Sequence, residues 1–212
     1  MVSQRVRNSH PTFRVSLRLR RKRSRGFTLI EMLVVLGIFA VLTSVILASH
    51  SRFGGVITLE NLAYDTALSV RQAQLYGIAV RSYGSNNFNV GYGLHFDCNS
   101  VSPCNMSTYL LFADALNGNG IYDVGEIVTP PSPYVLNGGF RVSDICVVPA
   151  GGSTYNCGLN TLDILFKRPE PDAYIRANGA SPLNDRAKII VTSPQGNSAS
   201  VLVEVSGQIS VQ

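Results

Sequence analysis

The sequence predicts an α+β protein in which one long N-terminal α-helix precedes, and packs on, an antiparallel β-rich domain. Three patterns support this fold class. An apolar run covers residues 27–48, apolar side chains recur at helical spacing over residues 49–83, and short alternating or β-branched runs follow to residue 212. We therefore expect a helix with one half in a membrane, and a single globular domain over residues 84–212.

The charge distribution separates residues 1–26 from the rest of the chain. The chain has 18 Lys and Arg against 13 Asp and Glu, a formal net charge of +5. Nine of the basic residues and none of the acidic ones lie in residues 1–26, so residues 27–212 have nine basic residues against thirteen acidic ones, a net charge of −4. This excludes a basic globular domain. A nucleic-acid-binding arm is the alternative interpretation of the basic segment.

Residues 27–48, FTLIEMLVVLGIFAVLTSVILA, predict a transmembrane helix. Their only charge is Glu31, and as a helix they would be about 33 Å long, enough for a hydrocarbon core of about 30 Å. Because the basic cluster precedes this run, we expect the N-terminus in the cytoplasm and the C-terminal domain outside. The run is too long for the core of a secretory signal peptide, and no Ala-x-Ala cleavage site follows it.

Residues 49–83 predict an amphipathic continuation of the same helix, to about Ser82. Apolar residues recur there at spacings of three, four and seven, and no proline interrupts them. The apolar residues are Leu59, Leu62, Ala63, Leu68, Leu75, Ile78 and Ala79.

From Asn87 onward the sequence predicts strands separated by turn residues, and no internal repeat is visible. The clearest stretch runs from Leu183 to Val211, where three strands are expected to form a meander. The expected strands are 88–97, 108–113, 134–148, 161–167, 173–177, 187–192, 199–205 and 208–211.

Glu31 lies inside the apolar run, where an ionised carboxylate costs about 2.5–3.5 kcal/mol at mid-bilayer. The residues around it, RGFTLIEMLVVLGI from Arg25 to Ile38, resemble the N-terminal motif of type IV prepilins and type II secretion pseudopilins. The resemblance implies cleavage by prepilin peptidase between Gly26 and Phe27, and N-methylation of Phe27. It also implies that Glu31 pairs with the terminal ammonium of a neighbouring subunit, which would neutralise both charges. A snorkelling Glu on a plain signal anchor is the alternative.

The helix-then-strands order resembles the GspH/FimT-type minor pseudopilins. Tyr92-Gly93-Leu94-His95-Phe96 is similar to the glycine-bearing strand that follows the helix in that family. The string LLFADALNGNGIYDVGE, Leu110 to Glu126, resembles the family's loop F-x-D-x-N-x-N-G-x-x-D-x-G-E, with one residue too many between Asp114 and Asn117.

The same loop is also similar to an EF-hand or dockerin-like calcium loop. Asn117, Asn119, Asp123 and Glu126 would occupy ligand positions three, five, nine and twelve, but position one would be Ala115. The alternative is a structural loop closed by Asx turns, because Asn and Asp side chains also bond to their own backbone. Calcium is the one cofactor that the sequence suggests.

The four cysteines all follow the apolar run. An even count in an envelope or extracellular compartment favours disulfides, and the sequence-local pairing, Cys98 to Cys104 and Cys146 to Cys157, closes the smallest loops of three possible connectivities. A zinc site is the competing interpretation, but CxxC spacing is missing and His95 is the only nearby imidazole.

The sequence does not predict an enzyme. No Gly-x-Ser-x-Gly elbow, Walker loop, His-Glu-x-x-His motif or paired catalytic carboxylates can be placed. His95 stands alone in an alternating strand, where a histidine is usually a satisfied structural residue.

DNA binding is the second hypothesis on function. Some FimT-type minor pilins take up DNA through a C-terminal Gly-Arg-x-Arg motif, but the matching place here is Gly207-Gln208-Ile209-Ser210, without either arginine. The five cations Lys167, Arg168, Arg176, Arg186 and Lys188 could still form a basic face.

The expected function is that of a structural minor pilin or pseudopilin subunit. Its expected partners are other such subunits, prepilin peptidase, the inner membrane and a secreted cargo. Its expected location is the bacterial inner membrane, and a filament after assembly. These residues do not choose between a type II secretion pseudopilus and a type IV pilus. A membrane-anchored domain that never polymerises is the third hypothesis.

Overall fold

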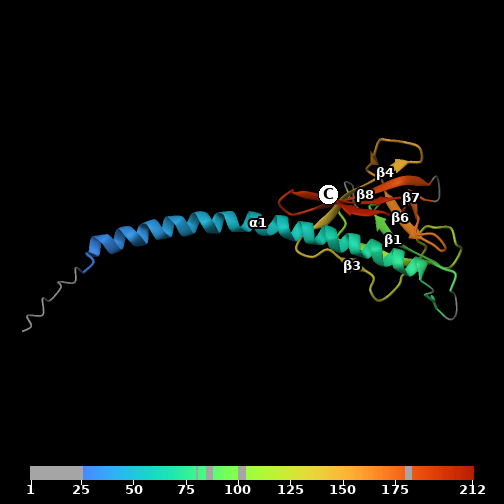
Figure 1. Ribbon diagram of the computed structural model, residues 1–212, viewed down its shortest axis with the longest axis horizontal. Coiled ribbons are helices and arrows are strands. Elements are labelled where there is room, and N and C mark those ends of the chain that lie inside the picture. The colour runs from blue at the N-terminus through green and yellow to red at the C-terminus, as the bar shows by residue number, and fades with distance from the viewer. Residues whose placement is uncertain (1–25, 80, 85–87, 100–103, 180–182) are drawn as a thin grey trace, which may run out of the picture. The chain divides into compact units, whose positions relative to one another are not determined.

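A computed structural model shows one long helix followed by an antiparallel sheet, which confirms the α+β prediction (Figure 1). The structure describes residues 26–79, 81–84, 88–99, 104–179 and 183–212, without the side chains of residues 48–53. The basic segment up to residue 25 lies outside these ranges. The chain divides into two compact units, Met1–Val45 and Ile46–Gln212.

Helix α1 covers Leu29–Ile78. Thr28 caps it, because the Thr28 Oγ1 accepts a hydrogen bond from the Glu31 N–H at 3.3 Å. The helix ends at Ile78, so the predicted end near Ser82 is four residues too late. No proline ends the helix, and Gly77 in its last turn lies against the sheet.

All ten strands in the described ranges belong to one antiparallel sheet with the order β10-β9-β8-β7-β6-β1-β2-β3, and β4 pairs with β8 and β5. The predicted meander is confirmed, because β8, β9 and β10 are successive antiparallel neighbours. The strands are β1 Gly91–Asp97, β2 Thr108–Asp114, β3 Tyr134–Val135, β4 Arg141–Pro149, β5 Asn156–Cys157, β6 Thr161–Phe166, β7 Ala173–Ala177, β8 Asn184–Thr192, β9 Ser198–Glu204 and β10 Ile209–Val211.

The predicted single strand 134–148 is wrong, since it is two strands on different partners. β3 pairs with β2, whereas β4 pairs with β8. Gly138 and Gly139 between them both have positive φ, a backbone conformation that interrupts an extended strand. The short strand β5 was not predicted, because two residues leave no alternation to detect.

The second half of α1 packs on one face of the sheet. The buried residues of this half that follow a four-three spacing are Leu59, Ala63, Thr66, Val70 and Ala73. The predicted face was wrong for four exposed residues, which are Leu68 (64% exposed), Leu75 (60%), Ile78 (37%) and Ala79. Two sets of residues at similar helical spacing could face the sheet in this segment. The set with the smaller side chains does so, because small side chains let the helix and the strands approach closely.

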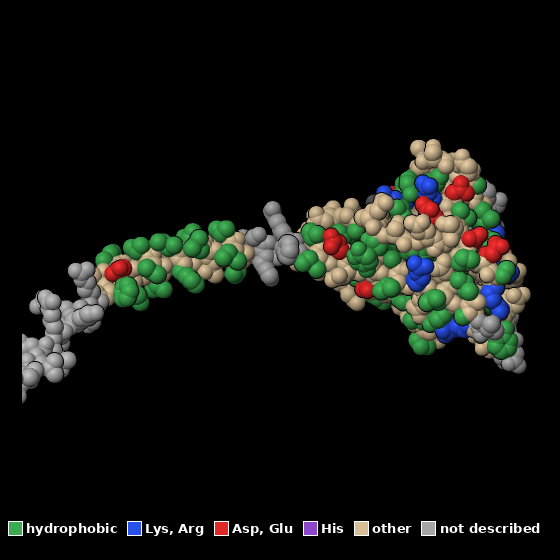
Figure 2. Space-filling view, in the orientation of Figure 1, with side chains coloured by type: hydrophobic (Ala, Val, Ile, Leu, Met, Phe, Trp, Pro, Cys, Tyr) green, Lys and Arg blue, Asp and Glu red, His purple; other side chains and the backbone are tan. Residues whose placement is uncertain are grey.

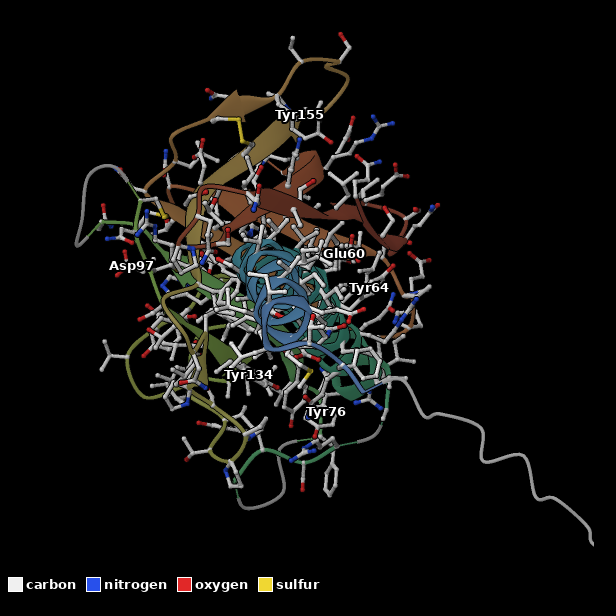
Figure 3. All side chains as sticks on the ribbon, turned by 90° about the vertical axis from the view of Figure 1, so that its left-hand side faces the viewer. Glu60, Tyr64, Tyr76, Asp97, Tyr134 and Tyr155 are labelled. Atoms are coloured by element: carbon white, nitrogen blue, oxygen red, sulfur yellow. A yellow bond between two sulfur atoms is a disulfide. The ribbon has the colours of Figure 1, made fainter. Side chains whose placement is uncertain are left out.

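Polar contacts fix the helix on the sheet. The Ser69 and Tyr109 hydroxyl oxygens are 2.9 Å apart, and the Tyr134 hydroxyl donates to the side-chain Oε1 of Gln72 at 2.6 Å. The buried Gln74 Nε2 donates to the carbonyls of Pro171 and Gly207, both at 3.0 Å. Tyr134 and Tyr76 lie on the same side of α1 (Figure 3).

Strand β1 is covered on both faces, which explains its glycine-aromatic alternation. Tyr92 and Phe96 belong to the face toward α1, where Tyr92 meets Tyr76 edge-on with ring centroids 5.7 Å apart. On the opposite face Gly93 leaves room for the Phe112 ring, and His95 lies beside Tyr122 at 4.8 Å between centroids. The segment from Asp114 to Glu126 therefore packs on the sheet face opposite α1.

Candidate functional site

The first candidate site is the junction of residues 26–28 with α1. Gly26, Phe27 and Thr28 are not helical, and α1 begins immediately after them. A Cβ at Gly26 would have no atom within 4 Å, and Phe27 is 79% exposed. The peptide bond between Gly26 and Phe27 thus lies in exposed, non-helical chain, two residues before α1, where a protease can reach it.

Glu31 lies in the first turn of α1, where a carboxylate is favoured by the helix dipole. Residues Leu29–Leu47 form a 19-residue stretch of mean hydropathy 2.6, long and apolar enough to cross a membrane, and none of it is buried. Figure 2 shows hydrophobic side chains along this segment, with one acidic side chain near its start. Because the other described side chains of this stretch carry no charge, the pattern combines a helix for lipid or helix contacts with a single ionisable group.

Residues 21–47 match the family model of the prokaryotic N-terminal methylation motif. The chain carries the motif of a type IV pilin-like prepilin. Neither curated proteins nor solved structures give a match to this chain. The motif indicates a type IV pilin-like prepilin substrate and implies processing by a peptidase and assembly with other pilins. The apolar helix Leu29–Leu47 is long enough to anchor such a chain in a membrane.

The second candidate site is the loop Asp114–Glu126. Glu126 is fully buried, and its carboxylate accepts from three backbone N–H groups. The Oε1 atom accepts from Ala115 and Leu116, both at 2.9 Å, and Oε2 accepts from Asp123 at 3.0 Å. The carboxylate therefore closes the loop by joining its two ends.

The three other predicted calcium ligands are bonded to one another and to the loop backbone. Asp123 Oδ2 accepts from the side-chain amides of Asn117 and Asn119, at 2.8 and 3.0 Å. The Asn117 Oδ1 accepts from the Asn119 N–H, and the Asn119 Oδ1 accepts from the Ile121 N–H. Both bonds span two residues, as in Asx turns.

Calcium binds six to eight oxygen atoms, whereas the Asn117, Asn119 and Asp123 side-chain oxygens accept hydrogen bonds within the loop. Among the described residues, the one group of three His, Cys, Asp or Glu ligand atoms within 4.8 Å of one another is Asp144, Cys146 and Cys157. Its two sulfur atoms form a disulfide. The loop geometry is that of an Asx-turn loop, and calcium binding stays a prediction.

Asp114 is the acidic residue that the predicted ligand set missed. It is 6% exposed, and its Oδ2 accepts from the Gly120 N–H at 2.9 Å, whereas its buried Oδ1 has no hydrogen-bond partner. Burial raises the pKa of Asp114, and the nearby charge of Glu126 raises it further. The signal in the sequence was the acid at the end of an alternating strand.

His95 is bonded to Asp163 rather than free. The His95 Nδ1 and Asp163 Oδ1 atoms are 2.7 Å apart, and the same Oδ1 accepts from the Tyr122 N–H at 3.2 Å. The pair joins β1 and β6 to the loop. Sequence reasoning could not find Asp163, because its role depends on the pairing of two strands distant in the chain.

The structure has the sequence-local disulfides, Cys98–Cys104 and Cys146–Cys157 (Figure 3). The second bond joins residues directly opposite each other in the β4–β5 pair. It fixes a strand of two residues that are both exposed.

The five cations considered for a basic face fall into two groups. Lys167, Arg168 and Arg176 line one pocket. Arg186 pairs with Glu204 at 3.3 Å on neighbouring strands, and the Lys188 Nζ lies 5.6 Å from the Tyr155 ring. The residues Gly207–Ser210 form the turn into β10 and the start of that strand.

Proposed function

We propose that this prepilin is a structural minor pilin or pseudopilin of the GspH/FimT type, cut after Gly26 and N-methylated at Phe27. One observation carries the proposal: within the methylation motif, the exposed and non-helical residues 26–28 directly precede an apolar helix. Cleavage there removes all nine basic residues of the N-terminal segment and leaves a product of net charge −4. The leader sets orientation, and the acidic product assembles.

Glu31 is the proposed assembly residue. It would be the fifth residue of the mature chain, counted from Phe27, on the exposed first turn of α1. An ammonium and a carboxylate are each unfavourable in lipid, but they neutralise each other when one subunit supplies the ammonium and the next the carboxylate. The pair also selects one axial register between helices.

The mature N-terminus provides the first experiment. Mass spectrometry of the full chain, purified from cells with prepilin peptidase, should find methylated Phe27 as the first residue. Gly26→Ala is expected to leave uncut precursor, while Gly37→Ala in the same helix, where a Cβ has no atom within 4 Å, is expected to be processed normally. A mature N-terminus at any other residue contradicts the proposal.

Glu31→Ala separates a filament subunit from a plain anchor. We expect the variant to be cut and membrane-bound but lost from sheared filaments. Glu31→Asp, which keeps the charge, should recover part of the incorporation. If Glu31→Ala enters filaments as well as wild type does, or if wild type is found in no filament, the non-polymerising anchor is the better description.

A further inference from the structure

Lys167, Arg168 and Arg176 meet at one pocket on the sheet face that carries the Asp114–Glu126 loop. The pocket has a volume of about 260 Å³, and its wall includes Asp114 and Asn119 from the loop and Tyr174 from β7. Neither the processing site nor the membrane helix involves it. Three cations from two chain segments therefore surround a space of roughly one side chain.

The cations are held in place by the fold. The Arg168 guanidinium donates to the Phe88 carbonyl, and the Arg176 side chain lies against Gly120, where a Cβ would be 2.9 Å from the Arg176 Nε. Lys167 follows the last residue of β6. Lys167 takes part in neither the His95–Asp163 pair nor the Arg186–Glu204 pair.

The pocket is positive within an acidic molecule. Its lining has three cations and one acid, Asp114, whereas residues 27–212 have a net charge of −4. The Lys167 charge lowers the pKa of Asp114, but burial raises that pKa more. Lys167 and Arg168 alone bring two positive charges to a pocket whose one lining acid is buried, so an incoming anion would be attracted.

We propose that this pocket receives an Asp or Glu side chain of a neighbouring filament subunit. The inference rests on the proposed function, since it needs a filament. Charge complementarity supports it, because a positive pocket on an otherwise acidic chain fits acidic subunits of the same kind. A protein side chain is favoured over a nucleic acid because the cations converge on one point, whereas single strands are bound by cations and aromatic rings along a track.

Site-specific photocross-linking tests the contact in assembled filaments. Benzoylphenylalanine replaces Tyr174 in the full chain, and the cross-linked peptide is identified by mass spectrometry. We expect a segment of another pilin-like subunit that contains Asp or Glu. Lys167→Glu should lower the yield roughly fivefold, and Lys167→Gln should lower it less. Lys188→Glu is the matched control outside the pocket and should leave the yield unchanged.

A charge exchange completes the test. If the mapped acid on the partner is changed to Lys, the yield should fall in the wild-type chain and return with Lys167→Glu. The inference is overturned if the cross-linked segment of the partner contains no Asp or Glu, or if the yield does not depend on the charge at position 167. So does a gel shift with DNA that Lys167→Glu abolishes and Lys188→Glu keeps, because the anion would then be phosphate.

The two proposals can fail separately. Suppose that Phe27 is methylated and that filament incorporation depends on Glu31, but that the cross-link at Tyr174 does not depend on charge. The pilin proposal then stands, and the proposed pocket contact is wrong. If the chain enters no filament, both are wrong.

Discussion

Gly77 of α1 lies directly against the backbone carbonyl of Phe166 in β6. A Cβ at Gly77 would be 2.3 Å from the Phe166 oxygen, well inside any van der Waals contact. The absence of a side chain at this position therefore sets how closely the helix and the sheet approach.

Gly77→Ala is expected to destabilise the domain by at least about 2 kcal/mol, because neither backbone can move without disrupting the packing of helix on sheet. Urea unfolding of the mature chain in detergent, followed by tyrosine fluorescence, measures the change. Gly54→Ala is the control in the same helix, since a Cβ there has no atom within 4 Å. It should be neutral, or stabilising by up to about 1 kcal/mol. Equal effects of the two variants would contradict this account of the contact.

The Glu126 carboxylate accepts from three backbone N–H groups, and Gln cannot replace it. In the Gln side chain an NH2 group, which only donates, replaces one of the two carboxylate oxygens. At least one loop N–H would then face this NH2 group instead of an acceptor. We expect Glu126→Gln to lower the free energy of unfolding by about 3 kcal/mol. The exposed Glu170 provides the same substitution without these contacts, and Glu170→Gln should change stability by less than about 0.5 kcal/mol.

The raised pKa of Asp114 predicts how the stability of the fold depends on pH. Because its pKa is raised in the folded state, the folded chain binds a proton at a higher pH than the unfolded chain does. The wild type should therefore gain stability relative to Asp114→Asn as the pH falls from about 7 toward the usual aspartate pKa of about 3.9. Unfolding of both chains across this range gives the difference. A constant difference, or a loss of relative stability at lower pH, would show that the pKa is not raised.

The two apolar registers of α1 make opposite predictions. Val70 is fully buried, whereas Leu68 is 64% exposed. Val70→Ser should lower the free energy of unfolding by more than about 2 kcal/mol, and Leu68→Ser should change it by less than about 0.5 kcal/mol in the monomer. If Leu68→Ser proves as costly as Val70→Ser, the assigned face is incorrect.

The Cys146–Cys157 disulfide holds the short β4–β5 pair. Replacing both cysteines by Ala should cost about 2–4 kcal/mol, chiefly because the unfolded chain gains freedom when a loop of this length is opened. Non-reducing peptide mapping of the wild type must show this pair and Cys98–Cys104. Four free thiols in the purified protein would refute the assignment.

The sequence by itself determined the elements that depend on local pattern. The apolar run with Glu31 near its start and the β8–β10 meander both follow from residues near one another in the chain. The methylation motif is equally local, so a continuous stretch of residues was enough to detect it.

Only the tertiary structure decided which residues meet. It placed Val70 inside and Leu68 outside, although both fit a helical repeat, because Gly77 and the small residues of α1 are what the sheet can accept. It divided 134–148 into two strands that pair with different partners, brought Asp163 to His95, and placed Lys167 and Arg176 at one pocket. The physical reason is the same in each case: spacing along a chain specifies a face or a strand, but burial and charge at that face depend on the partner that covers it.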